Sequence, residues 1–214
     1  MSKSVTANFA DASYSGRHLV GKVTAGFSMS LDGYVSDDGD GVDQVFKWYS
    51  IGDATSEISA GNATFAMSAE GATYIEDAGQ GAGVLVTGRR TFDLANAWGG
   101  RHPMGVPMVV VTHSPPPEWV DRPGSPFTFV TDGVPSAIDT AREIAGEKDV
   151  VVGAPSVTQE CLRLGLLDEI HIDLVPVLLG NGISLFRDIP STELLVTAAS
   201  GSPHVTHLTY RVVR

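Results

Sequence analysis

The sequence has little cysteine, little positive charge and no long apolar run, and each shortage excludes a class of protein. Its single cysteine, Cys161, excludes an internal disulfide and a cysteine-rich zinc site, and we expect this thiol to be buried as a small apolar group. Asp and Glu outnumber Lys and Arg by 25 to 14, so we expect no nucleic acid and no anionic membrane as a partner. The apolar runs are far shorter than the roughly 20 residues of a membrane-spanning helix. Nothing in the sequence indicates a metal site.

The first residues, MSKSVTANFADASYSGRH, are polar and lack the apolar run of a secretory signal. We therefore interpret residues 1–19 as a flexible tail and expect a cytoplasmic protein. The 214 residues, 43% of them hydrophobic, are enough for one well-packed core, so residues 20–214 are expected to form a single domain.

Short β-branched runs alternate with stretches of helical spacing, which predicts an α/β fold. Strands are expected at residues 22–31, 84–86, 106–112, 127–131, 149–152 and 169–176, and helices at 72–78, 91–97, 136–146 and 156–164. On the second of these helices, Phe92 and Leu94 are expected to face inward. Residues 194–199 and 205–213 flank a Gly-Ser-Pro turn, which predicts a terminal antiparallel hairpin.

Residues 149–186 form the stretch around which the rest of the chain is organised. A predicted strand ends at Gly153, Pro155 and Ser156 open a helix, and Gly165 ends it. The free backbone N–H groups at such a helix N-terminus attract anions, commonly a phosphate. Many strand-glycine-helix turns bind nothing, so a purely structural turn is an equal alternative.

A second turn of this kind follows residues 84–86, where Gly88 precedes Arg89 and Arg90. Two guanidinium groups beside free N–H groups predict a pyrophosphate cradle. Ion pairing on the surface of an acidic protein is the alternative, and the spacing alone does not separate the two.

Three other features have open interpretations. The run DDGDGVD at residues 37–43 lacks the full spacing and the closing Glu of a calcium loop, so a surface loop is favoured. Phe46, Trp48 and Tyr49 either wall a pocket or, as we favour, fill the core or a subunit contact. His171 and His207 fall on predicted strands, where satisfied or exposed sheet residues are more common than ligands.

Five stretches of the chain, in the same order, resemble those of one family. They are SMSLDGYVS (28–36), VLVTGRRTFD (84–93), VVVTHS (109–114), VVVGAPSV (150–157) and LDEIHIDLVPVLLGNGISLF (167–186). The chain resembles the dihydrofolate reductase-like reductases, in particular the reductase domain of bifunctional riboflavin-biosynthesis deaminase-reductases. This resemblance implies a three-layer fold with a mixed, mostly parallel sheet, helices on both faces and an antiparallel C-terminal hairpin. The zinc-deaminase signature is missing from the sequence, so only the reductase half is expected.

The resemblance also implies NADPH as the cofactor and assigns residues to its parts. Gly88, Arg89, Arg90 and Thr91 are expected at the phosphates, Thr112, His113 and Ser114 near the adenosine and its 2′-phosphate, Gly153, Ala154, Pro155, Ser156 and Val157 at the second pyrophosphate turn, and Ser28 and Val35 beside the nicotinamide. The charges of Arg90 and His113 would select NADPH over NADH.

The implied chemistry is hydride transfer to a polarised C=N or C=O carbon of a small molecule. Asp32, at the end of the first strand, is the candidate catalytic and substrate-binding residue, with turn formation in an Asp-Gly loop as the alternative. Trp98, Leu179 and Gly180 are expected to shape the substrate pocket. The resemblance further implies a homodimer and, as one candidate, the reduction of a ribosylaminopyrimidinone. A non-catalytic nucleotide- or small-molecule-binding protein on the same scaffold is the rival interpretation.

Overall fold

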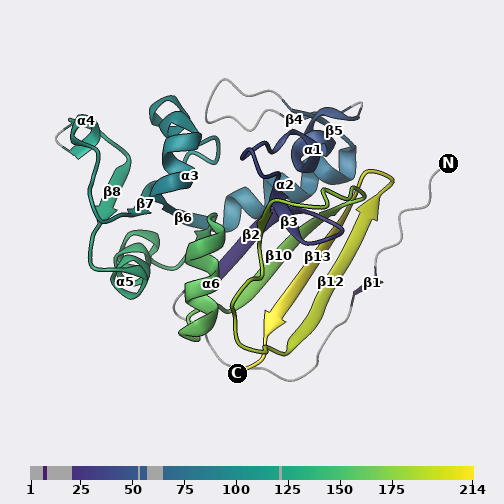
Figure 1. Cartoon of the computed structure of the whole chain (residues 1–214). Helices are drawn as coiled ribbons and strands as arrows, with labels where there is room; N and C mark the ends of the chain where they lie inside the picture. The colour runs from purple at the N-terminus through teal and green to yellow at the C-terminus, as the bar shows by residue number, and fades with distance from the viewer. Residues whose placement is uncertain (1–6, 9–20, 53, 57–64, 121) are drawn as a thin grey trace.

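The computed structural model describes residues 7–8, 21–52, 54–56, 65–120 and 122–214. Within these ranges a nine-stranded sheet forms the centre of the molecule (Figure 1). Its strands, in spatial order, are β1 (Ala7–Asn8), β12 (Leu194–Ser202), β13 (Val205–Val212), β10 (Glu169–Val175), β2 (Val23–Ser30), β9 (Asp149–Val152), β6 (Ala82–Gly88), β7 (Met108–Val111) and β8 (Phe127–Val130).

The type of strand pairing changes once across this sheet, from antiparallel to parallel at β10. All neighbours from β10 to β8 run parallel, whereas β10 and β13, β13 and β12, and β12 and β1 are antiparallel. The mixed, mostly parallel sheet and the antiparallel C-terminal hairpin are therefore confirmed. The expected tail, residues 1–19, lies outside the described residues except for β1, in which Ala7 pairs with Ala199.

The remaining elements are short strands and helices. They are β3 (Tyr34–Ser36) paired with β11 (Ile183–Ser184), β4 (Ala54–Ser56) paired with β5 (Phe65–Met67), the helices α1 (Asp43–Phe46), α2 (Ala69–Gly81), α3 (Arg89–Leu94), α4 (Pro117–Val120), α5 (Val134–Ala145) and α6 (Pro155–Arg163), and the 3₁₀ turns η1 (Lys47–Ser50) and η2 (Asn96–Gly100). In the part of the chain described here, no helix is long and apolar enough to cross a membrane.

The parallel half of the sheet is buried on both faces because its strands point alternate side chains into two apolar cores. On β6, Val84 and Val86 join the core that contains residues of α5 and α6, while Leu85 joins the core that contains Phe92 of α3. Helices therefore cover both faces of the sheet, as the three-layer fold requires. Burial on both faces also explains why these strands read as continuous apolar runs in the sequence.

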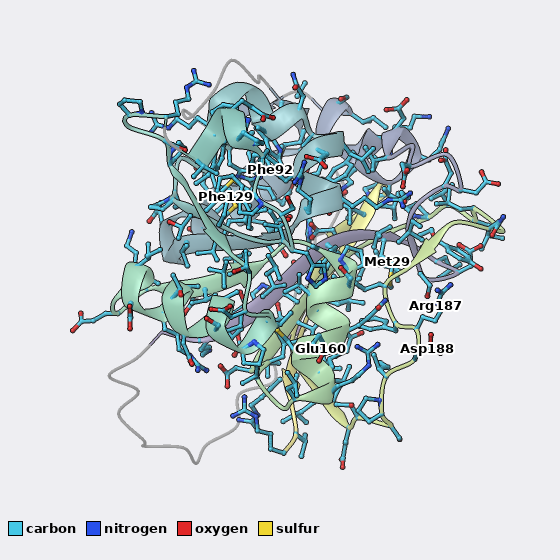
Figure 2. All side chains as sticks on the ribbon, turned by 60° about the vertical axis from the view of Figure 1, so that its left-hand side comes forward. Met29, Phe92, Phe129, Glu160, Arg187 and Asp188 are labelled. Carbon is cyan, nitrogen blue, oxygen red and sulfur yellow. The ribbon has the colours of Figure 1, made fainter. Side chains whose placement is uncertain are left out.

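Phe92 anchors the second core. Its ring meets Phe127 and Phe129 edge-on, with ring centroids 5.0 and 5.6 Å apart, and Figure 2 shows Phe92 and Phe129 side by side. The inward position of Phe92 is confirmed, but that of Leu94 is wrong, because Leu94 is 59% exposed. Residues two apart lie on different sides of a helix, so the two side chains could not share one buried face.

Several expected boundaries are also wrong. The helix expected at 72–78 extends over Ala69–Gly81, since the Ser68 side chain accepts a hydrogen bond from the Gly71 N–H (3.1 Å) and caps its first turn. The helix expected at 136–146 begins at Val134, with a proline in its first turn. The helix expected at 91–97 spans Arg89–Leu94 and is followed by left-handed backbone at Asn96, Ala97 and Trp98.

Candidate active site

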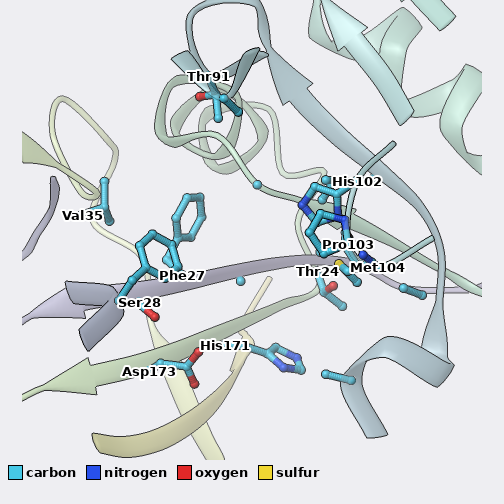
Figure 3. A pocket seen from close by; sticks show the side chains of 18 of the residues that line it. Thr24, Phe27, Ser28, Val35, Thr91, His102, Pro103, Met104, His171 and Asp173 are labelled. Carbon is cyan, nitrogen blue, oxygen red and sulfur yellow. Dashed lines mark hydrogen bonds between the residues drawn. The ribbon is translucent and has the colours of Figure 1, made fainter. Parts of the chain in front are cut away.

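A cavity of about 1800 Å³ lies over one face of the sheet (Figure 3). Its floor comes from three adjacent strands, through Thr24, Gly26 and Ser28 of β2, His171 and Asp173 of β10, and Thr209 of β13. Typical small-molecule sites measure roughly 300–1,000 Å³. This cavity is therefore large enough for an extended cofactor together with a second small molecule.

The two glycine turns singled out in the sequence meet at this cavity. They follow the neighbouring parallel strands β6 and β9, whose residues Val86 and Val152 are register partners. A Cβ atom placed on Gly88 would lie 3.6 Å from the Ser156 Oγ, so the two turns are in contact. Gly88, Arg89, Arg90, Thr91, Gly153, Pro155, Ser156 and Val157 all line the cavity, while Ala154 is 1% exposed and buried beneath it.

The two arginines beside Gly88 reach the cavity and also form ion pairs. Arg89 Nε lies 2.8 Å from both carboxylate oxygens of Asp93, and Arg89 Nη1 donates to the Ser114 carbonyl. Arg90 Nη2 lies 2.8 and 2.7 Å from the two carboxylate oxygens of Asp40. The ion-pair alternative is thus present in the structure, and a phosphate-binding role for either guanidinium stays a prediction.

A second cavity, of about 360 Å³, is lined by the three residues expected near the adenosine, Thr112, His113 and Ser114. Arg89 and Val111 line both cavities, so the two cavities are neighbours. Thr112 Oγ1 accepts from the Ser114 N–H (3.2 Å) and lies 3.0 Å from the Ser114 carbonyl, so the turn after β7 is held in one conformation.

Asp32 joins two loops. Its carboxylate accepts hydrogen bonds from the backbone N–H groups of Leu179 (3.2 Å) and Gly180 (2.7 Å) and from the Ser30 hydroxyl (2.6 Å). The Ser30 hydroxyl, followed by these backbone donors, lowers the pKa of Asp32. Asp32, Leu179 and Gly180 are not among the residues that line the two cavities. A direct contact between these three residues and a substrate stays a prediction.

The remaining expected residues, Ser28, Val35 and Trp98, do line the large cavity. Trp98 sits in left-handed backbone (φ 48°) and meets the His102 ring edge-on at 4.9 Å. Burial lowers the pKa of His102 from 6.5 to about 4, and its Nδ1 accepts a hydrogen bond from the Met104 N–H (3.2 Å). A neutral imidazole therefore forms this part of the wall.

The aromatic segment after α1 divides between the two roles considered for it. Trp48 is 2% exposed and packs in a third apolar cluster with Met67, Val175 and Val205, as the core interpretation predicts. Phe46 is 43% exposed, and both Phe46 and Tyr49 line the cavity. Tyr49 also packs against the third apolar cluster, so the core interpretation is wrong only for Phe46, the exposed last residue of α1.

Asp173, which lines the floor of the cavity, forms a buried polar pair with His207 that the sequence analysis did not predict. His207 Nδ1 lies 2.7 Å from Asp173 Oδ1, and the Tyr74 ring stacks on the His207 ring at 4.0 Å. The expectation of a satisfied sheet histidine at 207 is confirmed. Asp173 and His207 are distant in sequence and meet only through the pairing of β10 with β13. The alternation of polar residues along these two strands is the one signal that could have found them.

The aspartate-rich loop is held together by its own hydrogen bonds. Asp37 Oδ1 accepts from the N–H groups of Gly39 (2.9 Å) and Gly41 (2.7 Å), while Asp40 pairs with Arg90. This geometry is that of the favoured surface loop. Over the described residues, no group of three or more His, Cys, Asp or Glu side chains could hold a metal ion.

The mixed sheet, with helices on both faces and a cavity at two converging glycine turns, defines a dihydrofolate reductase-like fold. Residues 21–203 match the sequence model of the RibD C-terminal domain. The chain belongs to this family, whose members are reductases. No curated protein sequence matches it significantly.

Three solved structures illustrate the likeness of the fold. A protein from Shewanella sp. PV-4 named for riboflavin biosynthesis is 21% identical, with a TM-score of 0.69 over 90% of this chain and 99% of that chain. The Thermotoga maritima deaminase/5-amino-6-(5-phosphoribosylamino)uracil reductase is 14% identical, with a TM-score of 0.61 over 91% of this chain and 57% of that chain. The Enterococcus faecalis dihydrofolate reductase complexed with NADP(H) is 16% identical, with a TM-score of 0.58 over 92% of this chain and 99% of that chain.

Proposed function

We propose that this chain is an NADPH-dependent reductase that transfers a hydride to the polarised C=N or C=O carbon of a small heterocyclic or carbonyl substrate. The observation that carries the proposal is the meeting of the turns at Gly88 and Gly153 beside Arg89 and Arg90, at one end of a cavity that reaches the polar sheet floor. A cofactor with several phosphates fits the first end, and a substrate fits the floor.

The donor groups at the two turns suit a dinucleotide. Arg90, Thr91, Ser156 and the N-terminus of α6 supply cationic, hydroxyl and backbone donors for a pyrophosphate. The smaller cavity, with Thr112, His113, Ser114 and Arg89, would take the adenosine and its 2′-phosphate. When bound, the cofactor supplies the hydride, and the protein supplies binding and orientation.

The remaining lining residues position the reacting groups. Ser28 and Val35 would border the nicotinamide from β2 and β3, while Phe46, Tyr49 and Trp98 would exclude water from the substrate. In this proposal Asp32 stays the candidate catalytic residue, and its bonds to Leu179 and Gly180 keep the end of β2 fixed beside the floor.

Family membership makes the reduction of a ribosylaminopyrimidinone in riboflavin biosynthesis one candidate reaction, and a cytoplasmic homodimer belongs to the same proposal. The rival function is non-catalytic binding of a nucleotide or small molecule. It is favoured by the position of Asp32 outside the cavity lining and by the existing ion pair of Arg90 with Asp40.

The test is a titration of the full chain with NADPH and with NADH, followed by nicotinamide fluorescence at low and moderate salt. We expect tighter binding of NADPH, and Arg90→Ala should weaken it by roughly 1–3 kcal/mol, as loss of a charge-assisted contact predicts. Arg142→Ala is the matched control, because Arg142 lies on α5 and pairs with Asp139. Failure to bind either nucleotide would contradict the proposal.

Turnover separates the two rival functions once binding is established. Oxidation of NADPH with a panel of pyrimidinones, pteridines and small carbonyl compounds is expected for a reductase. Tight NADPH binding without oxidation by any member of a broad panel would favour the binding protein.

A further inference from the structure

Three polar side chains form a row across the middle of the sheet. Ser28 on β2 is the register partner of Asp173 on β10, and Asp173 is the register partner of His207 on β13. Each of the three is 5–7% exposed. Burying polar groups costs free energy unless they are hydrogen-bonded, so a row of this kind needs partners on every side.

Aromatic side chains supply these partners. Trp48 Nε1 donates to the Ser28 Oγ (2.9 Å), and the Tyr49 hydroxyl also bonds to Ser28. The Tyr74 hydroxyl bonds to Asp173 while its ring lies flat against His207. Burial first, and then the charge of Asp173, raise the pKa of Tyr49 and of Tyr74, so both phenols keep their protons.

Asp173 thus has a histidine and a phenol as partners and no guanidinium or ammonium group. Within the described residues its contacts are His207 Nδ1 at 2.7 Å and the Tyr74 hydroxyl, and no Lys or Arg lies at ion-pair distance. An ionised carboxylate can accept about four hydrogen bonds, so these two contacts leave acceptor capacity unused. Asp173 lines the cavity beside Ser28, as Figure 3 shows, and the unused capacity is available to a molecule there.

The surroundings of Asp173 favour a flat ligand. Tyr49 and Tyr74 line the same part of the cavity, and Phe46 presents a ring that is 43% exposed. Aromatic rings bind planar heterocycles through stacked and edge-on contacts, which add to the free energy of apolar burial.

The charges around the floor disfavour an anion. The acidic lining residues are Asp40, Glu76, Asp77, Asp149 and Asp173, the arginines are Arg89, Arg90 and Arg101, and the histidines are His102 and His171. Arg89 and Arg90 lie at the glycine turns, where the cofactor phosphates are proposed. His102 adds no positive charge near neutral pH, since burial lowers its pKa to about 4. One arginine, Arg101, is left among the lining residues for a substrate phosphate, which usually needs several converging donors.

From this geometry we infer that the floor of the large cavity binds the N–H edge of a planar, neutral or cationic heterocycle without a phosphate group, and that Asp173 is its hydrogen-bond acceptor. His207 and Tyr74 act as positioning residues that hold the carboxylate toward the cavity. The inference rests on the proposed function only in treating this ligand as the substrate. It narrows the substrate class to compounds such as free aminopyrimidines and excludes their phosphoribosyl derivatives.

The test uses simple probes on the full chain, with and without saturating NADPH. Benzamidine is a planar cation with an N–H edge, benzoate is its anionic analogue, and ribose 5-phosphate is a phosphate monoester. Calorimetric titration should show binding of benzamidine and no binding of benzoate. Asp173→Asn should weaken benzamidine binding about tenfold or more, as loss of a charge-assisted hydrogen bond predicts. Asp139→Asn on α5, where Asp139 pairs with Arg142, is the control and should leave the affinity unchanged.

Two results would overturn the inference. One is equal benzamidine affinity in the Asp173→Asn and unsubstituted proteins. The other is tighter binding of ribose 5-phosphate than of benzamidine to the NADPH-loaded protein. If Asp173→Asn does not fold, NMR of the unsubstituted protein answers the question, because benzamidine should shift the amide signals of Ser28 and Asp173, and unchanged signals would contradict the inference.

The outcome is separable from that of the proposed function. Benzamidine binding is measured without turnover, so its failure would leave the reductase proposal standing. A protein that binds benzamidine through Asp173 but never oxidises NADPH would keep the binding site and lose the reductase assignment.

Discussion

The carboxylate of Asp40 holds the guanidinium of Arg90, with Arg90 Nη2 at 2.8 Å from Oδ1 and 2.7 Å from Oδ2. Asp40 lies in the loop after β3 with a left-handed backbone (φ 65°), and both residues line the large cavity. The guanidinium that we propose as a ligand of a cofactor phosphate is therefore already paired with a carboxylate of the protein. A phosphate that binds there has to displace Asp40 from Arg90.

Asp40→Asn should tighten NADPH binding for this reason. The Arg90 side chain is 71% exposed, and exposed ion pairs contribute about 0.2–1 kcal/mol, so the expected gain in affinity is at most about fivefold. Asparagine also tolerates the left-handed backbone of this position. Fluorescence titration with NADPH checks the prediction. The control is Asp188→Asn, in the loop between β11 and β12. Weaker binding in Asp40→Asn would show that Asp40 assists the cofactor.

Asp32→Asn should lower the turnover of an established substrate while leaving the Kd of NADPH unchanged, because Asp32 fixes residues 179–180 and lies outside the cavity lining. Asparagine keeps one acceptor oxygen for the backbone N–H groups, whereas Asp32→Ala keeps none, so the thermal midpoint should fall further in Asp32→Ala. Steady-state kinetics and thermal unfolding of both variants separate the two effects. Unchanged kcat in both variants would remove Asp32 from the mechanism.

The pKa of Asp32 also predicts the pH at which its bonds are lost. Its pKa is lowered in the folded protein from 3.8, chiefly by the Ser30 hydroxyl, so its stabilising contribution is complete above that value and disappears as the pH falls through the lower folded-state pKa. Acid unfolding of the unsubstituted protein should therefore be steeper below pH 3.8 than that of Asp32→Asn. Parallel curves would mean that the carboxylate is not ionised in its loop contacts.

Local patterns in the sequence predicted the fold well because the parallel strands and the antiparallel strands differ in burial. The continuous apolar runs of β6, β7 and β9 identified the parallel core, and the glycines at 88 and 153 marked the turns that meet at the cavity. The polar floor was not predictable in this way. Asp173 and His207 come together through strand pairing over long sequence separation, and no local pattern records which strands pair.

The surroundings of Leu94 and of Asp32 could not be predicted from their own segments. Leu94 was expected to face inward, but α3 ends at Leu94 and the chain turns through left-handed residues before Gly100. Asp32 is a candidate catalytic and substrate-binding residue or a turn former by sequence, and its bonds to Leu179 and Gly180 depend on a loop far along the chain. Tertiary contacts decide such roles, and the secondary-structure propensity of one segment does not predict those contacts.

His102 should make the stability of the protein depend on pH between 4 and 6.5. Burial lowers its pKa in the folded state from 6.5 to about 4, so the unfolded chain binds more protons in this window and the folded state loses stability as the pH falls. The slope contributed by one such group is about 1.4 kcal/mol per pH unit. Urea unfolding at several pH values should show a smaller slope in His102→Asn, whose side-chain oxygen can still accept from the Met104 N–H. An unchanged slope would mean that His102 titrates normally.

Cys161 should resist alkylation in the folded protein. Its side chain is 0% exposed on the buried face of α6, and burial raises the pKa of the thiol to about 12, so little thiolate forms at neutral pH. Iodoacetamide labelling followed by mass spectrometry should detect one modified cysteine in urea and none without it. Rapid labelling of the folded chain would contradict the position of Cys161 in the core.

Gly182→Ala should destabilise the protein far more than Gly180→Ala, although both glycines lie in the same loop. A Cβ on Gly182 (φ +144°) would lie 2.0 Å from the backbone carbonyl oxygen of Ser36, where β11 pairs with β3, whereas a Cβ on Gly180 (φ +75°) would meet nothing within 4 Å. The second change costs only the left-handed backbone, about 1–2 kcal/mol, while the first must also push two strands apart, which places it at roughly 3–5 kcal/mol. Urea unfolding of both variants measures the difference. Because Ser36 and its neighbour Val35 line the cavity, Gly182→Ala should also weaken NADPH binding. Equal losses of stability in the two variants would mean that the close approach of Gly182 to β3 is absent.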